Sequence, residues 1–449
     1  MARTPAPDGL YRMTEKPPED PWAVVRDLPL GQEVEVEQSD GRTWRGTLVP
    51  SHELSLDRTI QLKLESGYNV GITIRPGDRV RVLGRPTESN GLGEGEPRPV
   101  PRGTGPWVAL LTTGGTIASR VDYRTGGVRP VKEEHEILGF YPDLEKDGPV
   151  RVTPVFDRLS EDIQPEDWLL LAEKVADSFR AGAEGVVIAH GTDTLAFTAA
   201  ALSFLVENPP GPVVLVGAQR SPDRPSSDGF TNITHAVRVA REKSLAEVVV
   251  LMHAGLSDDR FAIHRGTQVR KMHSSRRDAF ESRNGRPLGV VGPNGVEFSR
   301  PIRHPTAQPL TLHLGLDPAA GLLWFHPGLD PARASRFTEG LRGVVLAGTG
   351  LGHVSSNHLP WIREAIRSGV VVGMTTQCLA GDVDPYVYAT GRELLRAGVL
   401  YLNDLLPETA YVKMLWALGQ TREPAEVGRL MLQNRAGEFE PRHEPGGTG

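Results

Sequence analysis

Two short stretches of the sequence combine glycine with threonine, and each follows an apolar run. They are TTGGTIAS at 112–119 and HGTDT at 190–194, preceded by VALL and VVIA. Such apolar runs are typical of buried parallel strands, whose carboxyl ends carry the sites of α/β proteins. Threonine hydroxyls on turns at this edge suggest nucleophilic chemistry. Gly114, Gly115 and Gly191 would let the backbone bend and leave N–H groups free to bind an oxyanion.

A threonine hydroxyl becomes a good nucleophile only when a base removes its proton. Thr192 and Asp193 place a hydroxyl and a carboxylate on one turn, and Lys271 lies beside Arg270 in RGTQVRKMHSSRRDAF. A neighbouring cation and partial burial favour the neutral amine of a lysine, which could then act as the base. The pattern suggests a relay of Thr192, Lys271 and Asp193. By spacing alone, a solvated surface lysine is the commoner interpretation.

The sequence from Trp107 onward alternates strand-like apolar runs with longer helix-compatible stretches, which is typical of an α/β fold. The expected strands lie at 107–112, 186–189, 213–216, 248–252, 322–325, 343–347, 370–374 and 399–402. The expected helices lie at 166–180, 194–206, 229–243 and 359–368. The alternation predicts a doubly wound parallel sheet with both threonine turns at its carboxyl edge.

The residues before Trp107 have a different pattern, in which apolar and polar side chains alternate over short distances. Such alternation, broken by Gly, Asp and Pro turns, predicts about five antiparallel strands in a small barrel. The expected parts of the chain are a flexible tail at 1–21, a small all-β barrel at 22–85, a Pro/Gly linker at 86–106, an N-terminal lobe with the active site at 107–300, a C-terminal lobe at 301–435 and a flexible tail at 436–449.

Composition and missing motifs exclude several classes of protein. The formal net charge of −6 over 449 residues gives no general basic surface for nucleic acid. The sequence has no GxxxxGK[ST] phosphate loop, GxSxG elbow, HExxH or CxxC motif, so no site for ATP or zinc is expected on this chain. A single cysteine, Cys378, and the lack of a long apolar stretch predict a cytoplasmic protein without a membrane segment.

Four segments together resemble the asparaginase/glutaminase family, in their order and at the family's spacing. They are TTGGTIAS, AHGTDTLAFTAAAL, VVLVGAQRSPDRPSSDGFTN and VRKMHSSRRDAF. The resemblance implies a two-lobed body built on parallel sheets. It implies that Thr116 is the attacking nucleophile, with Tyr123 near it in a substrate-binding loop, and that Thr192, Asp193 and Lys271 form a second catalytic constellation.

The same resemblance implies amide hydrolysis that needs no metal or organic cofactor. Thr116 would attack a side-chain amide, ammonia would leave, and water would resolve the acyl-enzyme. Ser160, in DRLSEDIQPEDW, falls where the family binds the α-carboxylate of its substrate. Many relatives that hydrolyse free asparagine have Ser-Gln or Ser-Asp here, whereas this chain has Glu161, which we expect to contact the substrate as well.

The barrel, the linker and the body together resemble the D subunits of archaeal glutamyl-tRNA(Gln) amidotransferases. This resemblance implies a glutaminase that acts on glutamine and passes ammonia to an E-type subunit. The partner would bind ATP, Mg²⁺ and most of the Glu-tRNA(Gln). The implied assembly is a heterotetramer of two D and two E subunits, with a homodimer formed through the asparaginase-like body.

Two other functions remain open from the sequence. One is a free-standing cytoplasmic L-asparaginase with an appended barrel, and the other is a barrel-led binding scaffold with a vestigial site. A local excess of basic residues at 260–303, ten Arg or Lys against three acids, is compatible with a partner or tRNA surface. It is equally compatible with a solvated or packing face.

Overall fold

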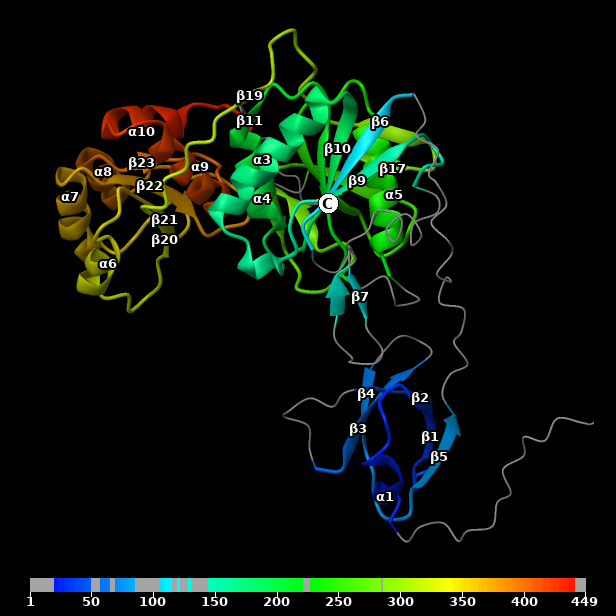
Figure 1. Cartoon of the computed structure of the whole chain (residues 1–449). Coiled ribbons are helices and arrows are strands. Elements are labelled where there is room, and N and C mark those ends of the chain that lie inside the picture. The colour runs from blue at the N-terminus through cyan, green and yellow to red at the C-terminus, as the bar shows by residue number, and fades with distance from the viewer. Residues whose placement is uncertain are drawn as a thin grey trace, which may run out of the picture. The chain divides into compact units, whose positions relative to one another are not determined.

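A computed structural model describes residues 20–49, 57–64, 69–84, 105–114, 119–121, 128–130, 144–220, 227–283 and 286–440 (Figure 1). These residues fall into two compact units, the smaller built mainly on residues 20–84 and the larger mainly on residues 105–440. Two further strands, β7 (Ser119–Val121) and β8 (Val128–Pro130), pair with each other. No helix in the described ranges is long and apolar enough to cross a membrane.

The smaller unit is an antiparallel sheet with the expected five strands and a short helix. Its elements are α1 (Trp22–Val25), β1 (Glu33–Glu37), β2 (Thr43–Val49), β3 (Thr59–Leu64), β4 (Asn69–Thr73) and β5 (Arg79–Gly84). The strands follow the order β4-β3-β2-β1-β5. Val34 and Val36 of β1 are buried in the core of the sheet with Leu62 and Ile72. Within the described ranges the edge strands β4 and β5 are not paired with each other, so the expected small barrel is half-open and not closed.

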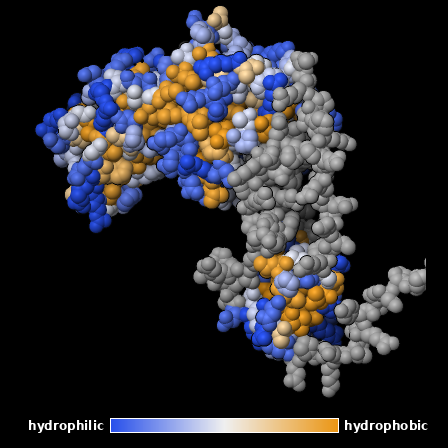
Figure 2. Space-filling view, viewed as in Figure 1, coloured by the Kyte–Doolittle hydropathy of each residue, from blue (hydrophilic) through white to orange (hydrophobic). Residues whose placement is uncertain are grey.

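The solvent face of this sheet carries paired charges. Glu33, Glu35 and Glu37 alternate along β1 with the buried valines and point to the opposite face. Their partners on the flanking strands form the ion pairs Arg45–Glu33, Arg81–Glu35 and Arg79–Glu37. The described strands therefore offer balanced charges instead of a basic surface. Apolar side chains also reach the surface of this unit (Figure 2), and the exposed large ones are Leu30, Val82 and Leu83.

The N-terminal lobe of the larger unit is built on an eight-stranded sheet with the order β18-β17-β14-β13-β12-β10-β6-β9. Its strands are β6 (Trp107–Thr112), β9 (Val150–Pro154), β10 (Ala183–Ala189), β12 (Val213–Val216), β13 (Val248–His253), β14 (Phe261–Arg265), β17 (Gly289–Gly292) and β18 (Gly295–Phe298). Its helices are η2 (Ser160–Asp162), α3 (Pro165–Arg180), α4 (Leu195–Leu205) and α5 (Gly229–Ala240). Short strands β15 (Val269–Lys271) and β16 (Phe280–Ser282) pair separately, as do β11 (Val206–Glu207) and β19 (Thr311–Leu312).

The prediction of a parallel sheet is right for five strands of this sheet and wrong for the other three. Strands β9, β6, β10, β12 and β13 run parallel, as expected. Strands β14, β17 and β18 extend the sheet in antiparallel fashion. Only residues 254–260 connect β13 to β14, which is too short for the crossover that a parallel pair requires. The chain must therefore turn back on itself at this point.

Side chains of the parallel strands alternate between two helical layers. Ala109 and Leu111 of β6 pack on the side of α3 and α4, while Val108 and Leu110 pack on the side of α5. Helices therefore cover both faces of the sheet (Figure 1). The expected start of α3 is also observed, because Gln164 N donates to the Asp167 carboxylate in a capping box. This packing fixes where the strands end, and with them the threonine turns.

The C-terminal lobe contains a second, fully parallel sheet with the order β20-β21-β22-β23. Its strands are β20 (Ala320–Trp324), β21 (Gly343–Gly348), β22 (Val371–Thr376) and β23 (Leu400–Tyr401). Its helices are α6 (Pro331–Phe337), η4 (Ser356–His358), α7 (Leu359–Arg367), α8 (Ala389–Ala397), α9 (Pro407–Gln420) and α10 (Pro424–Leu432). Helix α9 packs against α4 of the other lobe, so one apolar core runs through both lobes.

The prediction of a flexible tail at 436–449 is wrong for residues 436–440. Residues 436–440 pack against the body, with Glu438 almost fully buried. The Glu438 carboxylate pairs with Lys413 Nζ of α9 at 2.7 Å, and both side chains are inaccessible to solvent. A buried ion pair cannot be recognised in sequence when its members share no common motif, and the polar composition of this segment suggested a solvated tail. Residues 441–449 lie outside the described ranges.

Candidate functional site

The turn after β10 is held by a buried histidine. His190 Nδ1 donates to the carbonyl oxygen of Gly191 at 2.7 Å, and Nε2 accepts from Thr198 Oγ1 at 2.9 Å. Thr198 Oγ1 in turn accepts from Trp168 Nε1 at 3.0 Å. Complete burial lowers the pKa of His190 to about 4, so its ring is neutral at physiological pH. His190 therefore supports the shape of the turn.

Thr192 and Asp193 of this turn meet Lys271, which ends β15. Lys271 Nζ donates to Thr192 Oγ1 at 2.8 Å and to Asp193 Oδ1 at 2.7 Å. The Lys271 side chain is only 13% exposed, Thr192 is buried and Asp193 is 66% exposed. The structure thus brings together the three residues of the expected relay, and the interpretation of Lys271 as a solvated surface charge is excluded.

Two further expected residues lie against the same turn. Ser160, at the start of η2, is buried, and its Oγ lies 3.4 Å from Asp193 Oδ2 and 3.3 Å from Glu161 Oε2. Thr194 Oγ1 donates to the carbonyl oxygen of Ser160 at 2.6 Å, which fixes η2 to the turn. A hydroxyl and two carboxylates therefore lie at one point, a combination that can bind both ends of an amino acid zwitterion.

The first threonine turn is described only as far as Gly114. Thr113 is fully buried, and its Oγ1 donates to the carbonyl oxygen of Ala189 at 3.1 Å, so the turn after β6 lies beside the end of β10. Thr116 and Tyr123 lie outside the described residues, as does Gly115. Their roles stay predictions from the family resemblance.

Two glycines of these turns are required by local geometry. Gly114 has φ of +92°, a left-handed conformation that L side chains rarely adopt. Gly191 lies so close to η2 that an added Cβ would be 2.7 Å from Ser160 Cβ. A side chain at either position would displace the segments that carry the site.

The loop after β12 contains functional support that the site predictions did not include. The buried carboxylate of Asp228 accepts from the backbone N–H of Gln219 and Arg220 and from Asn232 Nδ2. Asn232 Nδ2 also donates to the carbonyl oxygen of Gly217 at 2.9 Å. These bonds fix the strand end next to the HGTDT turn. Asp228 stands directly before α5, but its carboxylate does not cap that helix, so the usual preference for Asp at this position could not have revealed its role.

The basic segment 260–303 is largely neutralised within the fold. At least seven of its ten basic side chains form ion pairs with described residues, namely Arg265–Glu247, Arg270–Glu408, Lys271–Asp193, Arg276–Asp278, Arg277–Asp258, Arg283–Asp382 and Arg300–Glu440. This pairing favours the packing interpretation over a tRNA surface. No group of three potential metal ligands converges among the described residues.

Buried histidines predict a loss of stability in mild acid. Burial lowers the pKa of His264 and of His190 to about 4, whereas unfolding restores ordinary values near 6.5. The unfolded chain therefore binds more protons, so stability is complete above pH 6.5 and is lost as the pH falls toward 4. At pH 5 each histidine costs about 2 kcal/mol of unfolding free energy.

Urea unfolding at pH 7 and pH 5 measures this effect. In the parent protein the free energy of unfolding is lower at pH 5 than at pH 7. In the variant His264→Asn this difference is expected to be smaller by about 2 kcal/mol, because one titrating group is removed. An equal pH dependence in the variant and the parent protein would contradict this assignment.

Comparison with known proteins adds three family matches. The model described as "Asparaginase, N-terminal" matches residues 107–304, and "Glutaminase/Asparaginase C-terminal domain" matches residues 321–431. The model described as "GatD N-terminal domain" matches residues 28–83. The matches follow the two lobes of the larger unit and the five-stranded sheet of the smaller one.

Full-length relatives and solved structures agree with these matches. The chain is 42% identical to the D subunit of glutamyl-tRNA(Gln) amidotransferase from Pyrococcus abyssi, covering 94% of this chain and 97% of that protein. It is 43% identical to the D subunit from Saccharolobus solfataricus, covering 94% and 96%. Its structure resembles the thermostable L-asparaginase from Thermococcus kodakarensis, with a TM-score of 0.69 and 34% identity over 75% of this chain and 100% of that chain. L-asparaginase I from Vibrio cholerae gives a TM-score of 0.66 and 29% identity, covering 75% and 99%.

Proposed function

Because this chain belongs to the family of glutamyl-tRNA(Gln) amidotransferase D subunits, we propose that it is the glutaminase subunit of a tRNA-dependent amidotransferase. It hydrolyses the side-chain amide of glutamine and supplies ammonia for the conversion of Glu-tRNA(Gln) to Gln-tRNA(Gln). An E-type partner binds ATP, Mg²⁺ and most of the tRNA. The proposal includes a homodimer through the asparaginase-like body, an assembly of two D and two E subunits, and a cytoplasmic location.

The observation that supports this proposal best is the contact of Lys271 Nζ with Thr192 Oγ1 and Asp193 Oδ1. An amine beside a buried hydroxyl can pass protons between that hydroxyl and a reacting group. Asp193 keeps the amine in place, because its carboxylate accepts a charge-assisted hydrogen bond. A free-standing asparaginase would share this chemistry, but the full-length match to D subunits, including the smaller unit, favours the glutaminase of an amidotransferase.

The proposed reaction has two steps through a covalent intermediate. Thr116 Oγ forms a bond to the amide carbon of glutamine, the carbon–nitrogen bond breaks, and the threonine proton leaves on ammonia. Water then forms a bond to the acyl carbon, the bond to Thr116 Oγ breaks, and a water proton returns to the threonine. Thr192 and Lys271 relay these protons, and backbone N–H groups of the glycine turns stabilise the oxyanion.

The group around Ser160 is proposed to hold the amino acid end of glutamine. Ser160 Oγ donates to the α-carboxylate, while Glu161 and Asp193 attract the α-ammonium group. The exposed position of Glu161 lets its carboxylate reach a ligand, and its contact with Ser160 supports a shared role of the two side chains. Tyr123 is proposed to cover the substrate near Thr116.

The purified chain is expected to hydrolyse glutamine in preference to asparagine. Its rate of glutamine hydrolysis is expected to be higher in the complex. We expect ammonia release from glutamine to rise about tenfold or more when an E-type partner, ATP, Mg²⁺ and Glu-tRNA(Gln) are added, because partner binding organises the site. Ammonia release and Gln-tRNA(Gln) formation are both measured, with asparagine as the competing substrate. High asparagine hydrolysis by the isolated chain, unchanged by the partner, would instead identify a free-standing asparaginase.

A further inference from the structure

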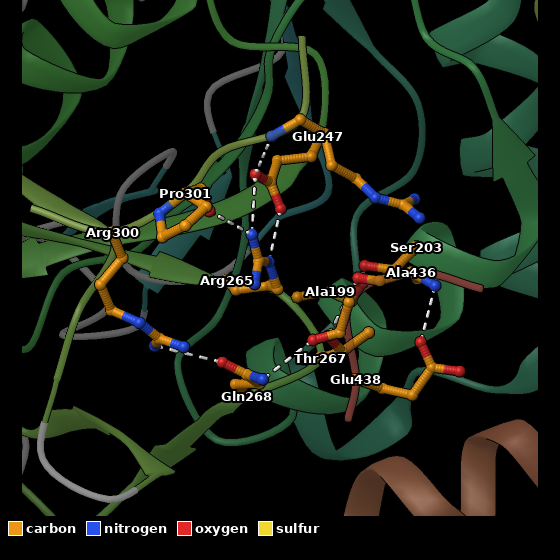
Figure 3. Close-up of polar contacts among 12 residues, drawn as sticks. Ala199, Ser203, Glu247, Arg265, Thr267, Gln268, Arg300, Pro301, Ala436 and Glu438 are labelled. Atoms are coloured by element: carbon orange, nitrogen blue, oxygen red, sulfur yellow. Dashed lines mark hydrogen bonds and ion pairs between the residues drawn. The ribbon is translucent and has the colours of Figure 1, made fainter. Parts of the chain in front are cut away.

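The segment 265–271 connects β14 to β15 and ends in Lys271. Residues of the C-terminal lobe contact this segment on two sides. Arg265, at its start, pairs with Glu247 at 2.7 Å and donates to the carbonyl oxygen of Pro301 (Figure 3). These contacts fix only the beginning of the segment. The contacts that hold the rest of it come mainly from residues much later in the chain.

On one side, the segment is held by the turn at residues 436–438. Thr267 Oγ1 donates to the carbonyl oxygen of Ala436 at 3.3 Å, and Gln268 Nε2 donates to that of Gly437 at 2.9 Å. Arg300 Nη1 donates to Gln268 Oε1 at 3.3 Å and fixes this amide from behind (Figure 3). Thr267 and Gln268 are both buried, so water does not compete for these bonds.

The turn at 436–438 is itself anchored to α9. The Glu438 carboxylate accepts from the backbone N–H groups of Arg435 and Ala436 and pairs with the fully buried Lys413 Nζ. Lys413 Nζ also donates to the carbonyl oxygens of Met431 and Gln433, which satisfies the ammonium group completely. The turn and α9 therefore act as one support.

On the other side, the first turn of α9 contacts the segment directly. Thr409 Oγ1 donates to the carbonyl oxygen of Thr267 at 2.9 Å. Glu408 Oε1 pairs with Arg270 Nε at 3.0 Å, and the two side chains are 13% and 23% exposed. The Arg270 guanidinium also lies 5.6 Å from the ring centre of Trp324 in β20. Arg270 is thus held by two elements of the C-terminal lobe.

Arg270 and Lys271 are neighbours on a strand, so their side chains point to opposite faces. One face of β15 is fastened to α9 through Arg270, and the other presents Lys271 Nζ to Thr192. Glu408 also neutralises the cation adjacent to Lys271. A shift of the Arg270 side chain would move the backbone of β15 and with it Lys271. The hydrogen bond from Lys271 Nζ to Thr192 Oγ1, at 2.8 Å, would then be stretched or lost.

We propose that Glu408 and Thr409 are positioning residues that set the place of Lys271 from the C-terminal lobe. They reach Lys271 through Arg270 and Thr267 and do not contact the substrate. This inference rests on the proposed function, because it assumes that Lys271 takes part in amide hydrolysis. It adds that the C-terminal lobe tunes the catalytic step and not only the stability of the fold.

The variants Glu408→Gln and Thr409→Val test the proposal in the full chain with glutamine as substrate. Both nearly keep the shape of the side chain and remove the charge or the hydroxyl donor. We expect kcat to fall by about 10- to 100-fold, because small misplacement of a catalytic group has large kinetic effects. KM should change by no more than about threefold, since substrate contacts remain. Thr409→Ser keeps the donor and is expected to restore kcat to within about threefold of the parent value.

The opposite end of α9 offers a matched control. Asp317 Oδ2 pairs with Arg342 Nη1 at 2.5 Å, and Arg342 also donates to the carbonyl oxygen of Leu418. Like Glu408→Gln, Asp317→Asn removes one carboxylate from an ion pair that contacts α9. The contacts described above do not link the Asp317 pair to Lys271. We expect a similar loss of melting temperature in both variants and an unchanged kcat in Asp317→Asn.

The outcomes separate this inference from the proposed function. Normal kcat in both Glu408→Gln and Thr409→Val, measured on folded protein, would overturn the positioning role. If Glu408→Gln does not fold, the comparison of Thr409→Val with Thr409→Ser decides the question, and equal kcat in these two overturns it. Full activity in a Lys271 variant would instead overturn the catalytic role of that lysine.

Discussion

Replacement of Lys271 by methionine is expected to lower kcat for glutamine hydrolysis by about 10³-fold, within the range for loss of a general base. Methionine keeps much of the length of the side chain but cannot bond to Thr192 Oγ1 or Asp193 Oδ1, which Lys271 Nζ contacts at 2.8 and 2.7 Å. KM for glutamine should change little, because the proton relay acts in the transition state. Steady-state ammonia release over a range of glutamine concentrations measures both constants.

Arg276→Met provides the control for this variant. Arg276 lies in the same β15–β16 hairpin, is exposed, and pairs with Asp278 two positions away. Its replacement removes one cation from the hairpin without touching Thr192 or Asp193, so kcat should stay within about twofold of the parent value. Comparable losses in both variants would show that hairpin charge, and not the relay, controls the rate.

Replacement of Thr116 by alanine is expected to have the largest effect, a loss of about 10⁴-fold or more in kcat, because the acyl-enzyme cannot form. Mass spectrometry of protein quenched during turnover measures the intermediate directly. The parent protein should carry a glutamyl adduct, and Thr116→Ala should carry none. Combining Thr116→Ala with Lys271→Met should cost no more than the larger single effect, since both residues serve one pathway.

Thr192→Ala is the matched control for the choice of nucleophile. Both threonines follow glycines after apolar strands, and Thr192 is the one whose hydroxyl meets Lys271. If Thr116 is the nucleophile, the adduct persists in Thr192→Ala while its turnover slows. An adduct that disappears in Thr192→Ala and persists in Thr116→Ala would reverse the two assignments.

The sequence was most informative where one residue pattern determines one element. Continuous apolar runs such as 213–216 predict buried strands, and Gln164 before a proline and two acids predicts the start of α3. Residue types alone suggested only weakly that Lys271 acts with Thr192, 79 positions away. The family resemblance made this pairing a firm prediction, because a shared fold relates residues that are distant in sequence.

The features that were missed depend on tertiary contacts. The packing of residues 436–440 requires Lys413 and the 265–271 segment, and nothing local in a polar stretch indicates them. Likewise, the sequence left open whether Arg and Lys at 260–303 form a partner surface or a packing face, because several of their carboxylate partners lie far away in the chain, such as Glu408 and Glu440. A run of charges in the sequence shows how many charges a segment carries, but only the fold determines whether other segments neutralise them.

Glu408, Thr409 and the turn at 436–438, which support Lys271, are synthesised well after Lys271 itself, and this order affects when the site can form. The ribosome makes Thr192 and Lys271 long before it reaches these residues. The strands of the N-terminal lobe can form early, but the lysine gains its full support only when residues near 440 have left the ribosome and folded back. Contacts across such long sequence separations slow folding, because closing a long loop costs entropy before the contact stabilises the chain. We therefore expect the amine to reach the geometry described here only after residues near 440 have been synthesised and have folded back.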